Sequence, residues 1–400
     1  MEWKIRVFIL TILKMYFFYI TALIPIGIGC ILWYKNNKVT LNEWFISGAV
    51  SLFLAIIFNL IAVLTIHNKT TDIETWSGRI TSVEHWPEWV ERWEEMHTES
   101  YPCGTDSNGN TTYCTRIYYT TEYDRHREKW QANLNFGALN EQYEITYDFY
   151  LQVKKELGGT IITDGIQPFH HNGTFYNGDN NRYVTINSTG YLHPVNIKRS
   201  FNNKVKATPN LFQFLKVPTN IVVYGYPQNA DWNQSDRLLG TANVLIDLLP
   251  FDQLNSRLGP NKRVNVIMVG MGNKDSVYGQ YQQAKWIGGK KNDLVITFGG
   301  GSKTEPAKWA YVFGWTEQDI VKRNIETLLL TNPINNSLLP KIEQEIQKNY
   351  IIKDWKKFDY IKVSPPGWVY WVYVILTILI QLGLHIWILN NEIDKSYWNR

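Results

Sequence analysis

The sequence predicts an α+β protein in which helical transmembrane anchors stand at both ends of a large soluble region. Long apolar segments without charged residues lie near both ends of the 400-residue chain, and such segments are typical of membrane spans. The region between them is rich in Thr and Tyr in its first half, which favours strands. In its second half strand and helix patterns alternate, which predicts an α/β arrangement.

Three segments reach the roughly 20 apolar residues that cross a bilayer: 15–34, 44–66 and 368–389. Each could instead be a buried core helix, but long helices without charge are rare in soluble cores. Trp and Tyr open the third segment, as expected at the lipid–water boundary. Lys4 and Arg6 precede the apolar run that leads into the first segment, as in a signal peptide. That segment is too long and lacks a small-residue cleavage pattern, so we expect an uncleaved anchor.

The spans divide the chain into parts with different composition. Residues 1–66 hold the first two spans and a short loop. After them we expect a β-rich domain over 67–210, an α/β domain over 211–352, a linker over 353–367 and, beyond the third span, a tail over 390–400.

The large region contains two cysteines, and the segment between them predicts a hairpin. Cys103 and Cys114 flank a ten-residue segment centred on Asn108-Gly109, and Asn-Gly is a strong hairpin signal. A hairpin brings both cysteines within disulfide reach, and a disulfide indicates an oxidising compartment. Two alternatives stay open: two free thiols, or a zinc site, although zinc-binding cysteines usually lie closer together. That zinc site would be completed by His97 and His126, or by His85.

Two sequence signals make opposite predictions for the side of the membrane that the large region faces. The lysines just before the third span favour the cytoplasm under the positive-inside rule. The paired cysteines favour an oxidising compartment. Because long domains cross membranes largely regardless of charge, we expect an extracytoplasmic domain in a multi-pass integral membrane protein.

In the β-rich domain, patterning predicts strands over 72–84, with a bend at Gly78, and over 111–124. Trp and Met at helical spacing predict a short amphipathic helix over 86–96, after which a longer helix is expected over 141–157. His170-His171 lies in an Asn/Gly loop, where a histidine pair is more often solvated than metal-bound. The Trp stripe could pack on its own domain or touch the bilayer.

In the α/β domain the pattern is more regular. Buried strands are expected at 220–227, 263–271, 293–300 and 308–315. Helices are expected at 238–259, 275–288, 316–330, starting at Thr316, and 337–352. Gly288-Gly289 with two lysines could suggest a phosphate loop, but a P-loop follows a strand and opens a helix. Here the helix comes first, so these glycines are expected to end it.

The order strand, helix, Gly-Lys-Lys, strand and strand over about 238–330 resembles the TPM domain. The matching pieces are "NVIMVGM", "YGQYQQAKWIGGKKND", "LVITFGG" and "WAYVFGWTE". TPM domains are typically membrane-tethered, and some are described as metal-binding or phosphatase-like. The resemblance implies that Asn292, Asp293 and Glu317 lie near an ion site for a divalent cation such as calcium, with Asp236 as a further acidic candidate. The Asn-Asp order is inverted relative to the family pattern.

The whole layout also resembles uncharacterised membrane proteins of large tailed phages. We therefore expect a membrane-anchored protein with a large globular domain for partner binding or envelope modification, not evidently catalytic. Its partners would be the lipid bilayer and another protein, with oligomeric state left open. A net charge of +4 without a basic aromatic cluster argues against nucleic acid. The alternative is a TPM-like metal-dependent phosphohydrolase that uses Asp236, Asp275, Asp293 and Glu317.

Overall fold

The chain forms two compact units in the computed structural model, which describes residues 16–24, 27, 41–136, 141–158, 160–186, 194–212, 214–228, 232 and 236–391. One unit contains the apolar helices and comprises Met1–Asp72, Ser200–Gln213 and Trp355–Arg400. The other contains most of the strands and comprises Ile73–Arg199 and Phe214–Asp354. The domain boundaries expected from the sequence stay predictions.

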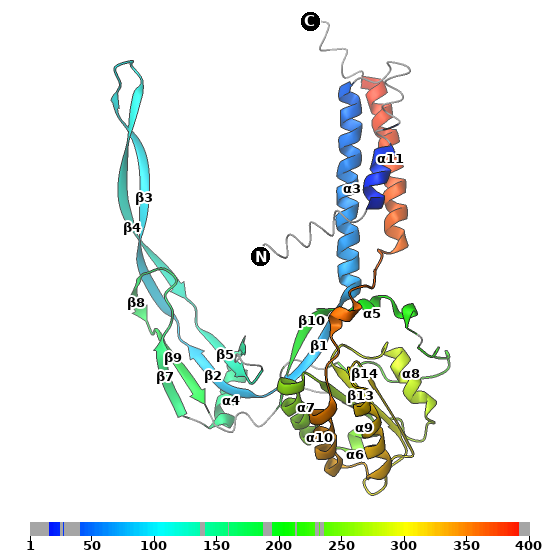
Figure 1. Ribbon diagram of the computed structural model, residues 1–400. Helices are drawn as coiled ribbons and strands as arrows, with labels where there is room; N and C mark the ends of the chain where they lie inside the picture. Colours follow the sequence, from blue (N-terminus) through cyan, green and yellow to red (C-terminus); the bar gives the residue numbers. More distant parts are fainter. Residues whose placement is uncertain are drawn as a thin grey trace. The chain divides into compact units, whose positions relative to one another are not determined.

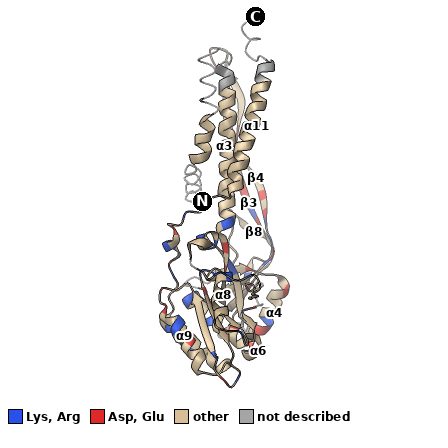
Figure 2. Cartoon of the chain, turned by 90° about the vertical axis from the view of Figure 1, so that its right-hand side faces the viewer, with Lys and Arg blue, Asp and Glu red and all other residues tan. Residues whose placement is uncertain are grey.

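Two helices of the first unit are long and apolar enough to span a membrane, α3 (Leu41–Thr70) and α11 (Gly367–Asn391). They lie side by side (Figure 1), and neither carries charged side chains along its middle (Figure 2). Gln381 of α11 donates hydrogen bonds to the Ser47 carbonyl oxygen at 3.1 Å and to Ser51 Oγ at 2.7 Å. The apolar segments near positions 45–70 and 367–387 are therefore helices that could cross a bilayer.

The first predicted span, 15–34, is described only at 16–24 and 27, where the chain is helical. Tyr373 of α11 donates a hydrogen bond to the Phe18 carbonyl oxygen at 2.8 Å, and both side chains are fully buried. This helical segment therefore packs against α11. The rest of the predicted span lies outside the described residues.

Short elements complete the first unit. They are α5 (Lys204–Ala207) and the 3₁₀ turns η1 (Pro209–Leu211) and η3 (Trp355–Phe358). Asn203 caps α5, because its side chain accepts a hydrogen bond from Lys206 N at 3.0 Å.

Two sheets occupy the beginning of the second unit. The predicted strand over 72–84 is two strands, with the break at Gly78: β1 (Thr71–Gly78), which pairs with β10 (Val195–Asn202), and β2 (Ile80–Trp86). A five-stranded sheet has the order β6-β5-β2-β9-β7. Its other strands are β5 (Lys129–Leu134), β6 (Glu141–Glu144), β7 (Thr160–Ile166) and β9 (Asn181–Ile186).

Helix α4 (Tyr147–Leu157) packs against this sheet through Tyr150, Val153 and Leu157. It ends at Gly158, which takes a left-handed conformation with φ 54°, as glycine at a helix end commonly does. The predicted helix over 141–157 is thus confirmed from Tyr147 onward, whereas its first residues form β6.

The longest strands of the chain, β3 (Trp89–Thr105) and β4 (Thr111–His126), form a hairpin. β8 (Thr174–Gly178) joins them but pairs only with the stretch Trp89–Arg92. Beyond Arg92, within the described residues, the two long strands pair only with each other. The hairpin is drawn in cyan in Figure 1.

The predicted helix over 86–96 is wrong. Trp89 and Trp93 are spaced four residues apart, which fits one helix face and equally one strand face. Pairing with the Thr- and Tyr-rich β4 supplies a continuous backbone ladder that decides between the two. Pairing with the distant strand β4 therefore outweighs the local helical pattern of this segment.

The α/β part is a four-stranded sheet of order β11-β12-β13-β14. β11 (Leu238–Gly240), β12 (Asn265–Gly270) and β13 (Asp293–Gly299) are parallel, and β14 (Trp309–Gly314) is antiparallel to β13. β12 and β13 are buried throughout, which explains their continuous apolar sequence. The helices are α6 (Ala242–Leu245), α7 (Leu248–Lys262), α8 (Val277–Lys285), α9 (Ile320–Thr331) and, after the turn η2 (Asn336–Leu338), α10 (Leu339–Asn349).

Both faces of this sheet are covered. Phe251 of α7, Ile325 of α9 and Ile342 of α10 join one core with Ile296 of β13. Aromatic residues around Trp286, just after α8, join the core on the opposite face. The predicted α/β arrangement is confirmed, and so are its central strands and helices.

Three local predictions in this part are wrong. Residues 220–227 form no strand; the Gln282 side chain bonds Tyr224 N at 3.0 Å and Tyr224 O at 2.9 Å, and so takes the place of a neighbouring strand. The helix expected over 238–259 begins as the strand β11 and is then divided into α6 and α7. α7 continues to Lys262, because Pro260 removes only one donor in its last turn. Thr316 does not start α9; its hydroxyl donates to the Ile351 carbonyl oxygen at 2.9 Å.

The glycine pair after α8 behaves as expected for a helix end. Gly288 and Gly289 have φ angles of 79° and 87°, which favour glycine. Gly288 N donates to the Gln283 carbonyl oxygen at 2.9 Å. The structural interpretation of this stretch is confirmed.

Candidate functional site

The base of the hairpin places chemically active side chains on one face. In the ladder Trp89 lies opposite His126, and Glu91 lies opposite Asp124. Paired residues of an antiparallel ladder share a face, and every second residue joins them. Trp93 therefore lies on this face as well.

A loop that precedes β8 closes over this face, and Glu91 holds it. The Glu91 side chain is fully buried and accepts backbone hydrogen bonds from His170 at 2.9 Å, His171 at 3.0 Å and Gly173 at 3.1 Å. Burial raises the pKa of Glu91, but these hydrogen bonds and the contact with His126 outweigh it and leave the pKa below its usual value. Glu91 is thus an ionised carboxylate that fixes the loop.

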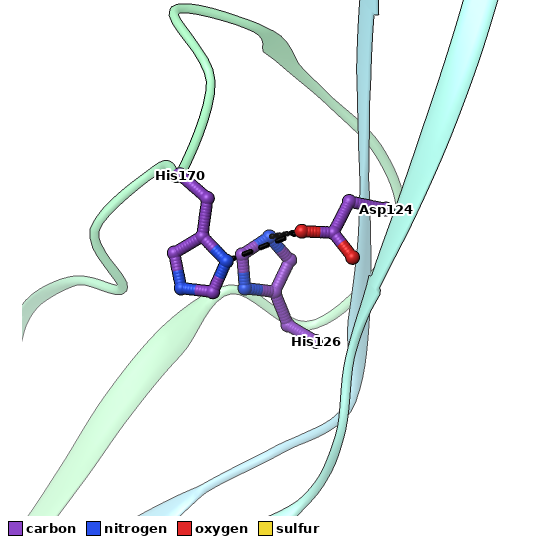
Figure 3. Close-up of side chains that lie close together, drawn as sticks. All are labelled: Asp124, His126 and His170. Carbon is purple, nitrogen blue, oxygen red and sulfur yellow. Dashed lines mark hydrogen bonds and ion pairs between the residues drawn. The ribbon is translucent and has the colours of Figure 1, made fainter. Parts of the chain in front are cut away.

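Histidine and aspartate side chains converge beside Glu91 (Figure 3). His170 Nδ1 lies 3.2 Å and His126 Nε2 lies 4.0 Å from Asp124 Oδ2. His126 Nε2 also lies 3.1 Å from Glu91 Oε2, and His171 Nε2 lies 3.7 Å from Asp124 Oδ2. One ligand atom each from Asp124, His126 and His170 lies within 4.8 Å of the other two.

Aromatic rings fix the orientation of these imidazoles. Trp89 stacks on His126 with ring centroids 4.0 Å apart, and Trp93 stacks on His171 at 3.9 Å. Trp89 is fully buried and donates from Nε1 to Gln167 Oε1 at 2.9 Å. The His126 ring is therefore held before any ligand binds.

A second cluster of the same kind lies further out on the same hairpin face. It consists of Glu95, His97 and Glu122. His97 Nε2 lies 2.8 Å from Thr120 Oγ1, and Glu95 is exposed. This cluster lacks a buried anchor comparable to Glu91.

Cys103 and Cys114 form a disulfide near the tip of the hairpin, with their Cα atoms 5.5 Å apart. The predicted pairing is confirmed, and the alternatives of free thiols and of a cysteine-bound zinc are not seen. Of the histidines considered for that zinc, His85 pairs with Glu128 at 2.7 Å and His126 belongs to the cluster at the base.

The opposite face of the outer hairpin is apolar and exposed. Four side chains define this outer apolar face, and they are between 57% and 69% exposed. They are Met96, Tyr113, Ile117 and Tyr119. Met96 lies opposite Tyr119, Ile117 lies opposite Thr98, and Tyr113 lies opposite Pro102. Surfaces of this composition are enriched in protein interfaces.

The residues expected at an ion site in the α/β part do not form one of the converging groups among the described residues. Asp293 is buried and accepts from Tyr226 Oη at 2.8 Å, Asn265 Nδ2 at 2.8 Å and Lys290 N at 2.7 Å. Burial raises the pKa of Asp293, and these donors lower it in part. Buried Asn292 donates from Nδ2 to the Thr75 carbonyl oxygen at 2.7 Å.

The other three acidic candidates lie apart from this pair along the chain. Asp236 lines a shallow pocket with Tyr226 and Leu238. Asp275 lies just before α8, and Glu317 Oε1 accepts from Asp354 N at 3.0 Å. A metal-binding role for these five residues stays a prediction.

The cluster at the hairpin base was missed because its members are far apart in sequence. His170-His171 was interpreted as a solvated pair, and Glu91 and Asp124 were assigned no role. The alternation Trp-x-Glu-x-Trp in β3 could have indicated that these side chains share one strand face. Only the register with β4 shows which residues lie opposite them. Comparison of the chain with protein-family models, curated proteins and solved structures gave no match.

Proposed function

We propose that the chain is a membrane-anchored protein that presents the outer apolar face of the β3–β4 hairpin to a protein partner outside the cytoplasm. The observation that supports this is the exposure of Met96, Tyr113, Ile117 and Tyr119 on a hairpin that, among the described residues, no other strand covers beyond Arg92. Exposed apolar patches of this kind mark interaction sites.

A protein suits this face better than lipid does. The reverse side of the same ribbon carries an ion pair between Arg116 and Glu99, with N and O atoms 2.9 Å apart. Both outer edges of the ribbon also carry backbone groups without a ladder partner in the described chain. Burying charges and unpaired backbone groups in hydrocarbon is costly, whereas a partner protein can pair with a strand edge.

The expected partner therefore has an apolar contact surface with few charges. An extended segment that adds to the free edge of β4 would satisfy backbone groups along that edge. Tyr side chains supply large contact area together with a hydroxyl that can hydrogen-bond at the rim. This function requires no catalysis by the chain.

Site-specific photo-crosslinking in the cells that naturally contain the protein tests the proposal. A photoreactive benzoyl-phenylalanine replaces Tyr119 in one variant and Tyr118, which projects from the opposite face, in the control. We expect one protein adduct of defined mass from position 119 and none from position 118. Ile117→Ala should lower the adduct yield by about tenfold, as for a central interface residue.

Three outcomes would overturn the proposal. They are an adduct with lipid alone, an adduct with a second copy of the chain alone, and equal adducts from positions 118 and 119. The phosphohydrolase alternative rests on the TPM resemblance, and no contact described above adds support to it.

A further inference from the structure

We propose that Asp124, His126 and His170 bind a zinc ion at the base of the hairpin. The three residues come from β4 and from the loop before β8, and their ligand atoms converge without a Cys ligand. Two imidazoles and a carboxylate are a donor set that zinc favours. The ion would tie the loop to the hairpin independently of the partner proposed above.

The distances between the donor atoms fit this ion. Zinc–nitrogen and zinc–oxygen bonds of about 2.0–2.1 Å in tetrahedral geometry place neighbouring donors about 3.3 Å apart. His170 Nδ1 and Asp124 Oδ2 are 3.2 Å apart, and His126 Nε2 and Asp124 Oδ2 are 4.0 Å apart. Small side-chain rotations suffice to close the site.

The surroundings prepare the donors for a cation. Asp124 and Glu91 bring two carboxyl groups next to the imidazoles, a set of donors that suits a divalent cation. Glu91 is held by three backbone N–H groups of the loop, including that of His170, so it acts as a positioning residue for this ligand. Zinc at His126 Nε2 would replace the present contact of that nitrogen with Glu91. Stacking on Trp89 limits the rotation of the His126 ring. Such supporting contacts tune metal affinity.

His171 lies on the same loop but outside the converging set. Its Nε2 lies 3.7 Å from Asp124 Oδ2, and Trp93 stacks on its ring. The three converging residues therefore leave the fourth position of a tetrahedral zinc ion to water, as in zinc sites with three protein ligands.

The test uses full-length protein in detergent that has been stripped with a chelator and dialysed. Zinc content after re-addition and dialysis is measured by elemental analysis, and Co²⁺ serves as a spectroscopic probe of tetrahedral coordination. We expect about one zinc per chain and a visible Co²⁺ absorption that zinc removes. His170→Ala, at a side chain that is 62% exposed, and Asp124→Asn should each weaken zinc binding at least about tenfold.

His97→Ala is the matched control, since it removes a histidine from the second cluster on the same face. It should leave zinc content and the Co²⁺ spectrum unchanged, and tryptophan fluorescence verifies that each variant is folded. The proposal is overturned by wild-type zinc binding in both His170→Ala and Asp124→Asn. It is also overturned by loss of zinc in His97→Ala. A wild-type zinc content no higher than that of an unrelated protein without either cluster would overturn it as well.

Discussion

Glu74 of β1 is a buried carboxylate near Lys291. Its side chain is 5% exposed, and Lys291 Nζ lies 3.9 Å from Glu74 Oε1. Glu74 Oε2 meets no donor in hydrogen-bond geometry within the described residues, although Trp76 lies close enough to favour the charged form. Burial raises the pKa of Glu74, and Lys291 offsets this only in part.

This raised pKa predicts a pH dependence of stability. The contribution of Glu74 to the free energy of unfolding is fully present below its unfolded pKa, near 4.5, and is lost as the pH rises through the folded pKa. Glu74→Gln should remove that loss, so the variant should be more stable than the wild type at pH 7 to 8. Urea unfolding of the full-length protein in detergent across this pH range measures the difference. Glu94→Gln, at an exposed position, should follow the wild type, and identical curves for all three proteins would contradict the prediction.

Individual residues of the site show where sequence reasoning stops. Asp124 is the last residue of the strand predicted over 111–124, and His126 lies where β4 continues beyond that prediction. Their neighbour His170 comes from a loop more than 40 positions away. Backbone hydrogen bonds to Glu91 and ring contacts with Trp89 and Trp93 fix that loop. No pattern in the sequence indicates such a contact, so the cluster could not be predicted from the sequence.

Elements with strong local signals were predictable. β12 and β13 are short apolar runs bounded by turn residues, and a glycine pair follows the end of α8 within one turn. The segment 86–96 was not predictable in the same way, because its tryptophans fit both periods. This segment is a strand because it pairs with β4, and no local sequence pattern identifies these two segments as pairing partners.

The disulfide should stabilise one element and leave the rest unchanged. The outer hairpin contacts no other strand beyond Arg92 among the described residues, and an isolated two-stranded hairpin is marginally stable in water. Replacing both Cys103 and Cys114 by Ser should therefore speed amide exchange between Met96 and the tip. Exchange in β12 and β13, which are buried throughout, should not change.

Hydrogen exchange followed by mass spectrometry distinguishes the two regions in one experiment. The wild-type protein treated with a reductant is the matched control and should behave like the double variant. Unchanged protection of the hairpin, or a loss of protection that extends to β12, would show that the disulfide does not act locally.

At the scale of the whole molecule, α3 and α11, the two described helices that could cross a bilayer, flank the large region along the chain. If both helices cross the bilayer, the segment between them lies on one side. Gln381 is buried between the helices and bonds Ser47 and Ser51. Polar contacts of this kind hold membrane helices together, while Leu52, Phe53 and Leu379 remain exposed for lipid.

The side that this segment faces can be determined from its cysteines. A disulfide persists in an oxidising compartment and is reduced in the cytoplasm, so we expect Cys103 and Cys114 to be bonded outside the cytoplasm. In a Cys30→Ser background they are the only cysteines. A membrane-impermeant maleimide should label intact cells only after an impermeant reductant, and a variant with Ser at all three positions should stay unlabelled. Labelling that requires permeabilised cells would place the large region in the cytoplasm, and labelling without reductant would show that the disulfide does not form. The first result would remove the basis for a partner outside the cytoplasm. The second would keep the hairpin outside but would contradict the disulfide between Cys103 and Cys114.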